Sequence, residues 1–244
     1  MTAKRRSLGG TASVKGVGLH TGAECTLSFK AAEPGQGIVF RRTDLDKPED
    51  VTATVANVSD VERRTSLGEG EARIQTVEHV LAALAAHDLD DVLVELAGPE
   101  PPTDNGSAEV FFKALSKAKP KDGDGEAAVY SIQTPFVVNE GEARYVVAPC
   151  DNLRLNVTID VDHPLIGKQM GCWDVGADTF AAELARARTY GFAAEADKLR
   201  SKGLAQGATE TNTVVLSDDG VIGNELIWPD EFVRHKAVDI LGDL

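Results

Sequence analysis

Hydrophobic and polar residues alternate with two different periods along this chain. Residues 153–161 read LRLNVTIDV, with apolar side chains at every second position, which is typical of a strand buried on one face. Shorter segments of the same character predict strands at residues 25–29, 38–41, 51–55, 92–96, 145–148 and 213–216. Apolar residues three and four positions apart predict helices at residues 76–87, 108–117, 177–186 and 231–244.

The order of these elements predicts an α+β fold with mostly antiparallel sheets and two similar domains. Each half of the chain has strands first and then a helix that contains Val-x-His, at Val77 to His79 and at Val233 to His235. This weak repeat suggests an internal duplication. Residues 119–128 contain Pro, Gly and charged residues with few apolar side chains, which indicates a linker. We expect a first domain at residues 1–118 and a second at residues 129–244.

Composition and charge narrow the functional classes. A hydrophobic fraction of 42% allows an ordinary globular core. A formal net charge of −14 argues against a nucleic-acid-binding protein and against steady adhesion to anionic lipid. No apolar segment approaches the length that spans a membrane, and the basic N-terminus lacks the apolar core of a signal peptide. We therefore expect a cytoplasmic protein without stable membrane insertion.

The three cysteines are widely spaced and odd in number, so we expect neither a disulfide framework nor a structural zinc site of the Cys type.

His235 and Asp239 are four positions apart in a predicted helix, so their side chains lie on one face about one turn apart. A helix commonly presents two ligands to one metal ion with this spacing. The same spacing also occurs in ordinary ion pairs on helix surfaces, and by itself it leaves both interpretations open.

Glu78 and His79 begin another apolar helix, in TVEHVLAAL. His79 is a candidate third ligand, and Glu78 is a candidate general base for a metal-activated water. The alternative is an acidic residue placed at a helix N-terminus by the helix dipole.

Two further motifs could contribute to a site. The Gly-rich segment GVGLHTG contains His20, and glycines permit tight turns and a close approach to a ligand. The segment RARTYGF contains Thr189, whose hydroxyl could stabilise an oxyanion. A plain hairpin and a helix C-cap are the respective alternatives.

The motifs GVGLHTG, FRRTDL, TVEHVLAAL, NGSA, ARTYGF and DEFVRHKAVDILGDL, in this order, resemble the bacterial UDP-3-O-acyl-N-acetylglucosamine deacetylases of the LpxC family. The resemblance covers essentially the whole chain. It implies two similar α+β domains, each with two helices layered on a sheet, and an active site between them. It also implies a zinc-dependent amide hydrolase of lipid A biosynthesis that removes acetate from UDP-3-O-acyl-N-acetylglucosamine. We expect it to act as a monomer.

The resemblance assigns a role to each candidate residue. It implies that the Zn²⁺ ligands are His79, His235 and Asp239. It implies catalytic roles for Glu78 as general base, Thr189 as oxyanion donor, Lys236 as a cation near the polar head of the substrate, and Asp243 as partner of a general acid. It implies that His20, Tyr190 and Lys236 bind the substrate, and that residues 163–173 form the passage for the acyl chain.

The chain departs from the family pattern at two places. Asn105 replaces the usual Asp before Gly-Ser-Ala, and an amide cannot act as a carboxylate. The family also continues beyond Gly-Asp-Leu with a strand, a loop bearing the general-acid His, and a helix. The internal repeat also indicates missing elements, because the helix that contains His79 in the first half is followed by another strand and another helix. We therefore expect the second domain to be incomplete at its C-terminus.

These departures leave two alternatives to the deacetylase. One is a catalytically impaired relative that retains zinc and binds the UDP-sugar lipid without efficient turnover, since a lost general acid typically costs about 10²–10⁴ in rate. The other is a zinc deacetylase for a different sugar amide.

Overall fold

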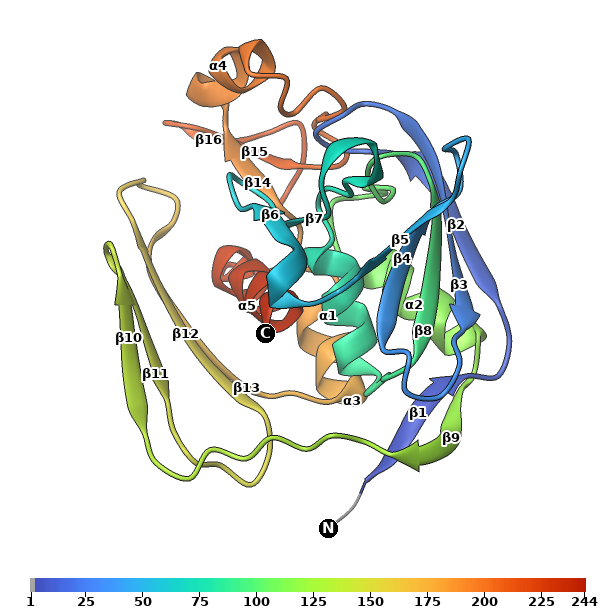
Figure 1. Cartoon of the computed structure of the whole chain (residues 1–244). Coiled ribbons are helices and arrows are strands. Elements are labelled where there is room, and N and C mark those ends of the chain that lie inside the picture. Colours follow the sequence, from blue (N-terminus) through green and yellow to red (C-terminus); the bar gives the residue numbers. More distant parts are fainter. Residues whose placement is uncertain (1–2) are drawn as a thin grey trace.

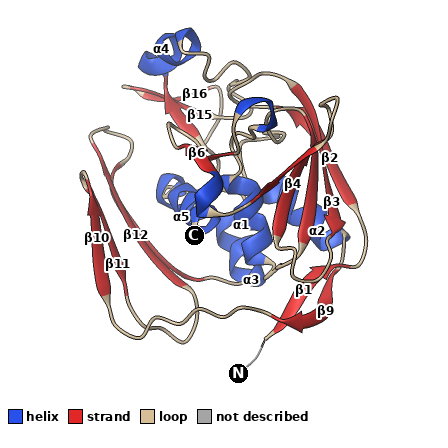
Figure 2. Ribbon diagram, in the orientation of Figure 1, coloured by secondary structure: helices blue, strands red, loops and turns tan. Residues whose placement is uncertain are grey.

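The computed structural model describes residues 3–244 and shows a mixed chain of helices and strands. Helices α1 to α5 are combined with several sheets in which antiparallel pairing predominates (Figures 1 and 2). The expected combination of helices with mostly antiparallel sheets is therefore confirmed.

The largest sheet comes from the first half of the chain and has the strand order β2-β3-β8-β4-β5. Neighbouring strands are antiparallel except for β4 and β8, which are parallel. Along the central strand β8, buried side chains alternate with half-buried ones, which is the period that the sequence predicted. The strands are β2 (Ala12–Val17), β3 (Glu24–Ala31), β4 (Ile38–Arg42), β5 (Glu49–Thr52) and β8 (Val92–Ala97).

Helices α1 (Glu78–Ala86) and α2 (Glu109–Lys117) share one hydrophobic core with this sheet. On α2, Phe111 packs edge-on against Phe29 of β3, with ring centroids 6.5 Å apart. Helix α1 has the sequence EHVLAALAA and is buried on almost every side. A helix that is apolar around most of its surface belongs in the interior, and α1 lies there between α2 and α5 (Figure 1).

The second half of the chain forms smaller sheets. Strand β10 (Phe136–Glu140) pairs with β11 (Ala143–Val147), and β12 (Arg154–Val161) pairs with β13 (Gly167–Asp174). Both are antiparallel hairpins. A three-stranded sheet contains β14 (Tyr190–Phe192), β15 (Val214–Ser217) and β16 (Gly220–Ile222), with β14 parallel to β15.

Helix α5 (Glu231–Asp243) brings the second half against the first. It packs directly on α1, so the two helices that carry Val-x-His lie side by side at the centre of the molecule (Figure 1). The contact is very close at Gly242, because a Cβ atom there would overlap the backbone of Glu78. Glycine at this position is what allows the helices to approach each other so closely.

The segment expected to be a linker contains a strand. Residues 120–126 form β9 (Pro120–Glu126), which pairs antiparallel with β1 (Lys4–Leu8). Local composition gave no sign of this, because the backbone of β1 supplies the hydrogen bonds that stabilise β9. The first residue of β9 is proline, a position that proline tolerates in a strand.

Two other predicted segments also differ from the sequence pattern. The expected helix at residues 177–186 is a single α-turn, α3 (Ala177–Thr179), followed by a π-helical turn, Phe180–Leu184. The expected strand at residues 51–55 ends at Thr52, and a 3₁₀ turn, Val55–Asn57, follows it. Elements β6 (Val58–Asp60), β7 (Ser66–Leu67) and α4 (Ala196–Ser201) are too short to produce a periodic pattern.

None of the helices within residues 3–244 has both the length and the apolar character required to cross a membrane.

Candidate metal centre and active site

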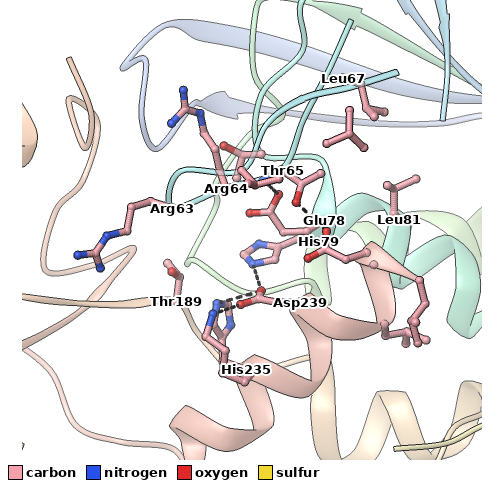
Figure 3. A pocket seen from close by; sticks show the side chains of 18 of the residues that line it. Arg63, Arg64, Thr65, Leu67, Glu78, His79, Leu81, Thr189, His235 and Asp239 are labelled. Atoms are coloured by element: carbon pink, nitrogen blue, oxygen red, sulfur yellow. Dashed lines mark hydrogen bonds and ion pairs between the residues drawn. The ribbon is translucent and has the colours of Figure 1, made fainter. Parts of the chain in front are cut away.

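Two helices that are far apart in sequence bring three candidate ligands together. His79 lies in the first turn of α1, and His235 and Asp239 lie on one face of α5. One donor atom from each of these residues lies within 4.8 Å of the other two. Figure 3 shows both imidazole rings directed toward the Asp239 carboxylate.

The spacing of the donor atoms fits a tetrahedral metal ion. Oδ1 of Asp239 lies 3.5 Å from Nε2 of His79 and 3.4 Å from Nε2 of His235. Ligand atoms about 2.0–2.1 Å from a tetrahedral ion are separated from one another by roughly 3.3–3.4 Å. Two imidazoles and one carboxylate also leave a fourth position for water or substrate, as in catalytic metal sites. The residues present therefore suit a metal ion of this kind.

The orientation of His235 suits a metal ligand. Its Nδ1 lies 3.0 Å from the carbonyl oxygen of Ala187, so Nδ1 carries the hydrogen and donates it to that oxygen. Burial lowers the pKa of His235 to about 4, which keeps the imidazole neutral. Its Nε2 therefore presents a lone pair toward Asp239. A hydrogen bond of this kind behind a ligating histidine fixes both its tautomer and its direction.

Asp239 is held as a carboxylate with one free oxygen. Its Oδ2 accepts a hydrogen bond of 2.6 Å from Nζ of Lys236, which leaves Oδ1 facing the histidines. Burial opposes ionisation of Asp239, but nearby positive charge, including that of Lys236, outweighs burial and lowers its pKa. The same carboxylate raises the pKa of Lys236, which remains an ammonium group.

Glu78 is a buried carboxylate immediately before His79. Burial raises its pKa to about 7, although the neighbouring His79 opposes the shift. Its Oε2 accepts a hydrogen bond of 3.1 Å from the backbone N–H of Thr65. A carboxyl group that titrates near neutrality, beside the ligand cluster, can accept and release a proton at physiological pH.

Thr65 connects Glu78 to a second carboxylate. Its hydroxyl donates a hydrogen bond of 2.7 Å to Oδ1 of Asp243, at the end of α5. Burial raises the pKa of Asp243, and the bond from Thr65 opposes that shift. Thr65 was not among the residues singled out from the sequence, because no spacing relates it to either acid.

The two motifs around Thr189 and Asn105 lie next to each other. The backbone N–H of Thr189 donates a hydrogen bond of 2.8 Å to the carbonyl oxygen of Gly106. Gly106 has a φ of +86°, and a Cβ atom there would overlap the carbonyl oxygen of Asn212. Asn105 uses its side-chain oxygen to accept hydrogen bonds from the backbone N–H and hydroxyl of Ser107, at 3.1 and 2.7 Å. An amide oxygen is sufficient for both contacts.

His20 and Tyr190 lie on opposite halves of the chain and face the same space. Burial lowers the pKa of His20, and its Nδ1 accepts a hydrogen bond of 3.3 Å from the backbone N–H of Ala205. The neutral ring therefore carries its hydrogen on Nε2. Tyr190 packs edge-on against Phe232 and lies 6.3 Å from the His235 ring, measured between centroids.

One cavity of about 990 Å³ joins these groups. It is lined by all nine candidate residues: His20, Glu78, His79, Thr189, Tyr190, His235, Lys236, Asp239 and Asp243. Apolar side chains line another part of it, among them Leu81, Leu84 and Leu89.

The acyl-passage segment is not part of this wall. Residues 163–173 form the turn after β12 and most of β13, and no residue between 163 and 173 lines the cavity. Trp173 instead packs into the main hydrophobic core. The apolar lining comes from Val161, Phe192, Leu241 and Leu244 and from the first half of the chain, and a passage formed by residues 163–173 stays a prediction.

The sequence analysis also did not identify two buried carboxylates beside the site. Glu231 is fully buried at the start of α5 and pairs with Arg188, whose Nε lies 2.8 Å from Oε1. Glu100 lies between prolines after β8 and is only 1% exposed. In the sequence, only the two flanking prolines distinguish Glu100, and they do not indicate which residues it contacts.

Comparison with known proteins agrees with this geometry. Residues 5–244 match the family model described as LpxC, UDP-3-O-acyl N-acetylglycosamine deacetylase. The chain is 40% identical over 241 residues to the UDP-3-O-acyl-N-acetylglucosamine deacetylase of Myxococcus xanthus, covering 98% of this chain and 77% of that protein. It is 38% identical over 246 residues to the enzyme of the same name from Brucella melitensis biotype 2, covering 100% of this chain and 86% of that protein. The chain therefore belongs to the LpxC family of UDP-3-O-acyl N-acetylglycosamine deacetylases.

Proposed function

We propose that this chain is a zinc-dependent hydrolase that removes the N-acetyl group from UDP-3-O-acyl-N-acetylglucosamine in lipid A biosynthesis. The observation that carries the proposal is the convergence of His79, His235 and Asp239 beside the buried carboxylate of Glu78, in a chain of this family. Two nitrogen ligands and one oxygen ligand suit Zn²⁺. Zinc, when bound there, would polarise the amide carbonyl and lower the pKa of a water molecule.

The chain's own residues would handle the proton and the charge. The Glu78 carboxylate takes a proton from the attacking water, and its pKa of about 7 suits a general base near neutral pH. The hydroxyl of Thr189, on the cavity wall, donates to the oxygen that becomes negative as the amide is attacked. Lys236 remains charged beside Asp239 and attracts the anionic head of the substrate.

Asp243 is proposed to support proton delivery to the leaving amine, and Thr65 holds its carboxylate in place. His20 and Tyr190 are proposed to contact the sugar. The Nε2–H of His20 is free to donate because Nδ1 is already bonded to Ala205. The apolar part of the cavity, which includes Leu81 and Leu84, would accept the acyl chain.

The site draws ligands from both halves of the chain. His79 precedes residue 118, whereas His235 and Asp239 follow residue 129. This supports the proposal that residues 1–118 and 129–244 are two related domains with the active site between them.

Turnover by the purified chain tests the proposal. The protein is stripped of metal, reloaded with Zn²⁺ and assayed for acetate release from UDP-3-O-acyl-N-acetylglucosamine. We expect zinc-dependent release that falls by about 10²–10⁴ in Glu78→Gln, which should still bind zinc. His235→Gln should lose both zinc and turnover. Substrate binding without zinc-dependent release would contradict the proposal and favour a binding protein. Equal turnover of a substrate lacking the acyl chain would argue for a different sugar amide.

A further inference from the structure

Glu100 is a buried carboxylate that the proposed mechanism does not use. Its side chain is only 1% exposed. Its neighbours His20 and Thr76 line the cavity but Glu100 does not, so the carboxylate lies behind the cavity wall. Burying a carboxylate is costly unless hydrogen bonds replace the lost water. The contacts of Glu100 therefore show what this carboxylate stabilises.

Within residues 3–244, all the hydrogen-bond donors to Glu100 come from two segments that border the cavity. Its Oε2 accepts from the backbone N–H and hydroxyl of Thr21, at 2.8 and 2.9 Å, and from the backbone N–H of His20, at 3.0 Å. Its Oε1 accepts from the same His20 N–H, at 3.0 Å, and from the hydroxyl of Thr76, at 2.7 Å. One carboxylate thus joins the His20 loop to the segment that enters α1.

On the loop side, the chain fits tightly around this carboxylate. A Cβ atom at Gly18 would lie 2.9 Å from Cδ of Glu100, so glycine there leaves room for the carboxylate to lie against the loop. The loop also accepts backbone hydrogen bonds from Gln206 and Gly207, at 3.1 and 2.9 Å. The His20 loop is therefore held both by Glu100 and by the segment at residues 205–207.

On the helix side, Glu100 stabilises an unusual backbone conformation. Thr76 has a φ of +56°, which is strained for a β-branched residue. Its hydroxyl bond to Glu100 and the 2.9 Å bond from the N–H of Gln75 to the carbonyl oxygen of Pro99 hold the chain in this conformation. The next residues are Val77, Glu78 and His79, so the conformation at Thr76 determines where α1 begins.

We propose that Glu100 is a positioning residue that fixes His20 relative to Glu78 and His79 across the cavity. The inference rests on the proposed deacetylase function. Glu100 contacts neither the cavity nor the metal ligands, so it acts only through the two segments that it joins. Placement matters because a misplacement of about 1 Å can reduce a rate roughly 10²-fold.

Two substitutions of similar size separate positioning from simple stability. Glu100→Met removes every acceptor, and we expect kcat to fall about 10- to 100-fold with KM changing less than about threefold. Glu100→Gln retains an oxygen for the Thr21 and His20 N–H groups, and its NH₂ can donate to the Thr76 hydroxyl. We therefore expect Gln to restore kcat to within about threefold of wild type.

Asp91→Asn is the matched control. Asp91 is also buried, at 2% exposure, and its carboxylate binds Arg5 and the N–H of Gly37 away from the cavity lining. We expect this variant to lose thermal stability while the kcat of the folded protein stays at the wild-type value. If Glu100→Met reduces kcat no more than Asp91→Asn does, or if Gln fails to restore it, the proposal is wrong.

A second readout does not depend on turnover. In the wild type, the ¹⁵N resonances of the His20 ring, assigned by their loss in His20→Gln, should report a single tautomer with its hydrogen on Nε2. We expect Glu100→Met to give a mixture of tautomers, and an unchanged ring would overturn the proposal. If the wild type lacks deacetylase activity, the proposed function fails while this measurement still tests the positioning role.

Discussion

Replacing Gly242 with alanine would place a methyl group inside the contact between α1 and α5. The new carbon would overlap the carbonyl oxygen of Glu78 and would lie 2.7 Å from its carbonyl carbon. Ordinary van der Waals contact begins at 3.4 Å, so relieving the contact with the carbonyl carbon alone takes about 0.7 Å, and the closer carbonyl oxygen requires the helices to separate by about 1 Å or more. The atoms in the way belong to a backbone, which cannot rotate aside as a flexible side chain can.

The expected effect is the difference between two opposing terms. Alanine in place of glycine favours a helix by about 0.5–1 kcal/mol. Overpacking in a close contact costs about 1–3 kcal/mol, so we expect a net loss of roughly 1–2 kcal/mol. For a chain of this length, that loss lowers Tm by about 2–8 °C. A separation of about 1 Å between Glu78 and the α5 ligands should also reduce kcat by about 10-fold or more.

Thermal unfolding and steady-state kinetics on the zinc-loaded protein measure both effects. Gly176→Ala is the control, because Gly176 has an extended backbone, with φ of −173°, and no atom within 4 Å of the added carbon. We expect the control to keep the wild-type Tm and kcat. A Gly242→Ala protein that is as stable and active as wild type would show that the helices do not require this close approach.

Three further predictions follow from burial and charge. In metal-free protein, burial raises the pKa of Glu78 to about 7 from an ordinary 4.5, so its ionisation destabilises the fold as pH rises through this range. Glu78→Gln should therefore raise the Tm of metal-free protein at about pH 8 and change it little at about pH 4. An equal increase in Tm at both pH values would contradict this prediction. Burial raises the pKa of the Cys25 thiol to about 12, while the other cysteines are exposed. A thiol reagent at about pH 8 should modify only the other two in native protein, and early loss of Cys25 would show the burial to be wrong. Arg188→Met leaves the carboxylate of Glu231 buried without its guanidinium, so the free energy of unfolding should fall by about 3–5 kcal/mol in denaturant titration, and an unchanged midpoint would refute this.

Local patterns predicted elements whose side chains have a regular period. The alternation at residues 153–161 became β12, and the apolar spacing at residues 76–87 became α1, shortened by one or two residues at each end. The pattern failed where a distant partner decides the conformation. Strand β9 has the composition of a loop, and it forms because the backbone of β1 lies beside it. The pattern also did not predict the π-helical turn at Phe180–Leu184, which interrupts a segment with the periodicity of a plain helix.

Within the site, the sequence by itself determined the residue types and their local geometry. It placed His235 and Asp239 on one helix face and put Glu78 next to His79, because spacing along a helix fixes direction. The tertiary structure alone decided that α1 and α5 touch, that Nε2 of His235 is the free nitrogen, and that Thr65 and Glu100 hold the surrounding acids and loops. These features depend on contacts between segments far apart in the chain. Packing, rather than the period of any one segment, determines which of those segments meet.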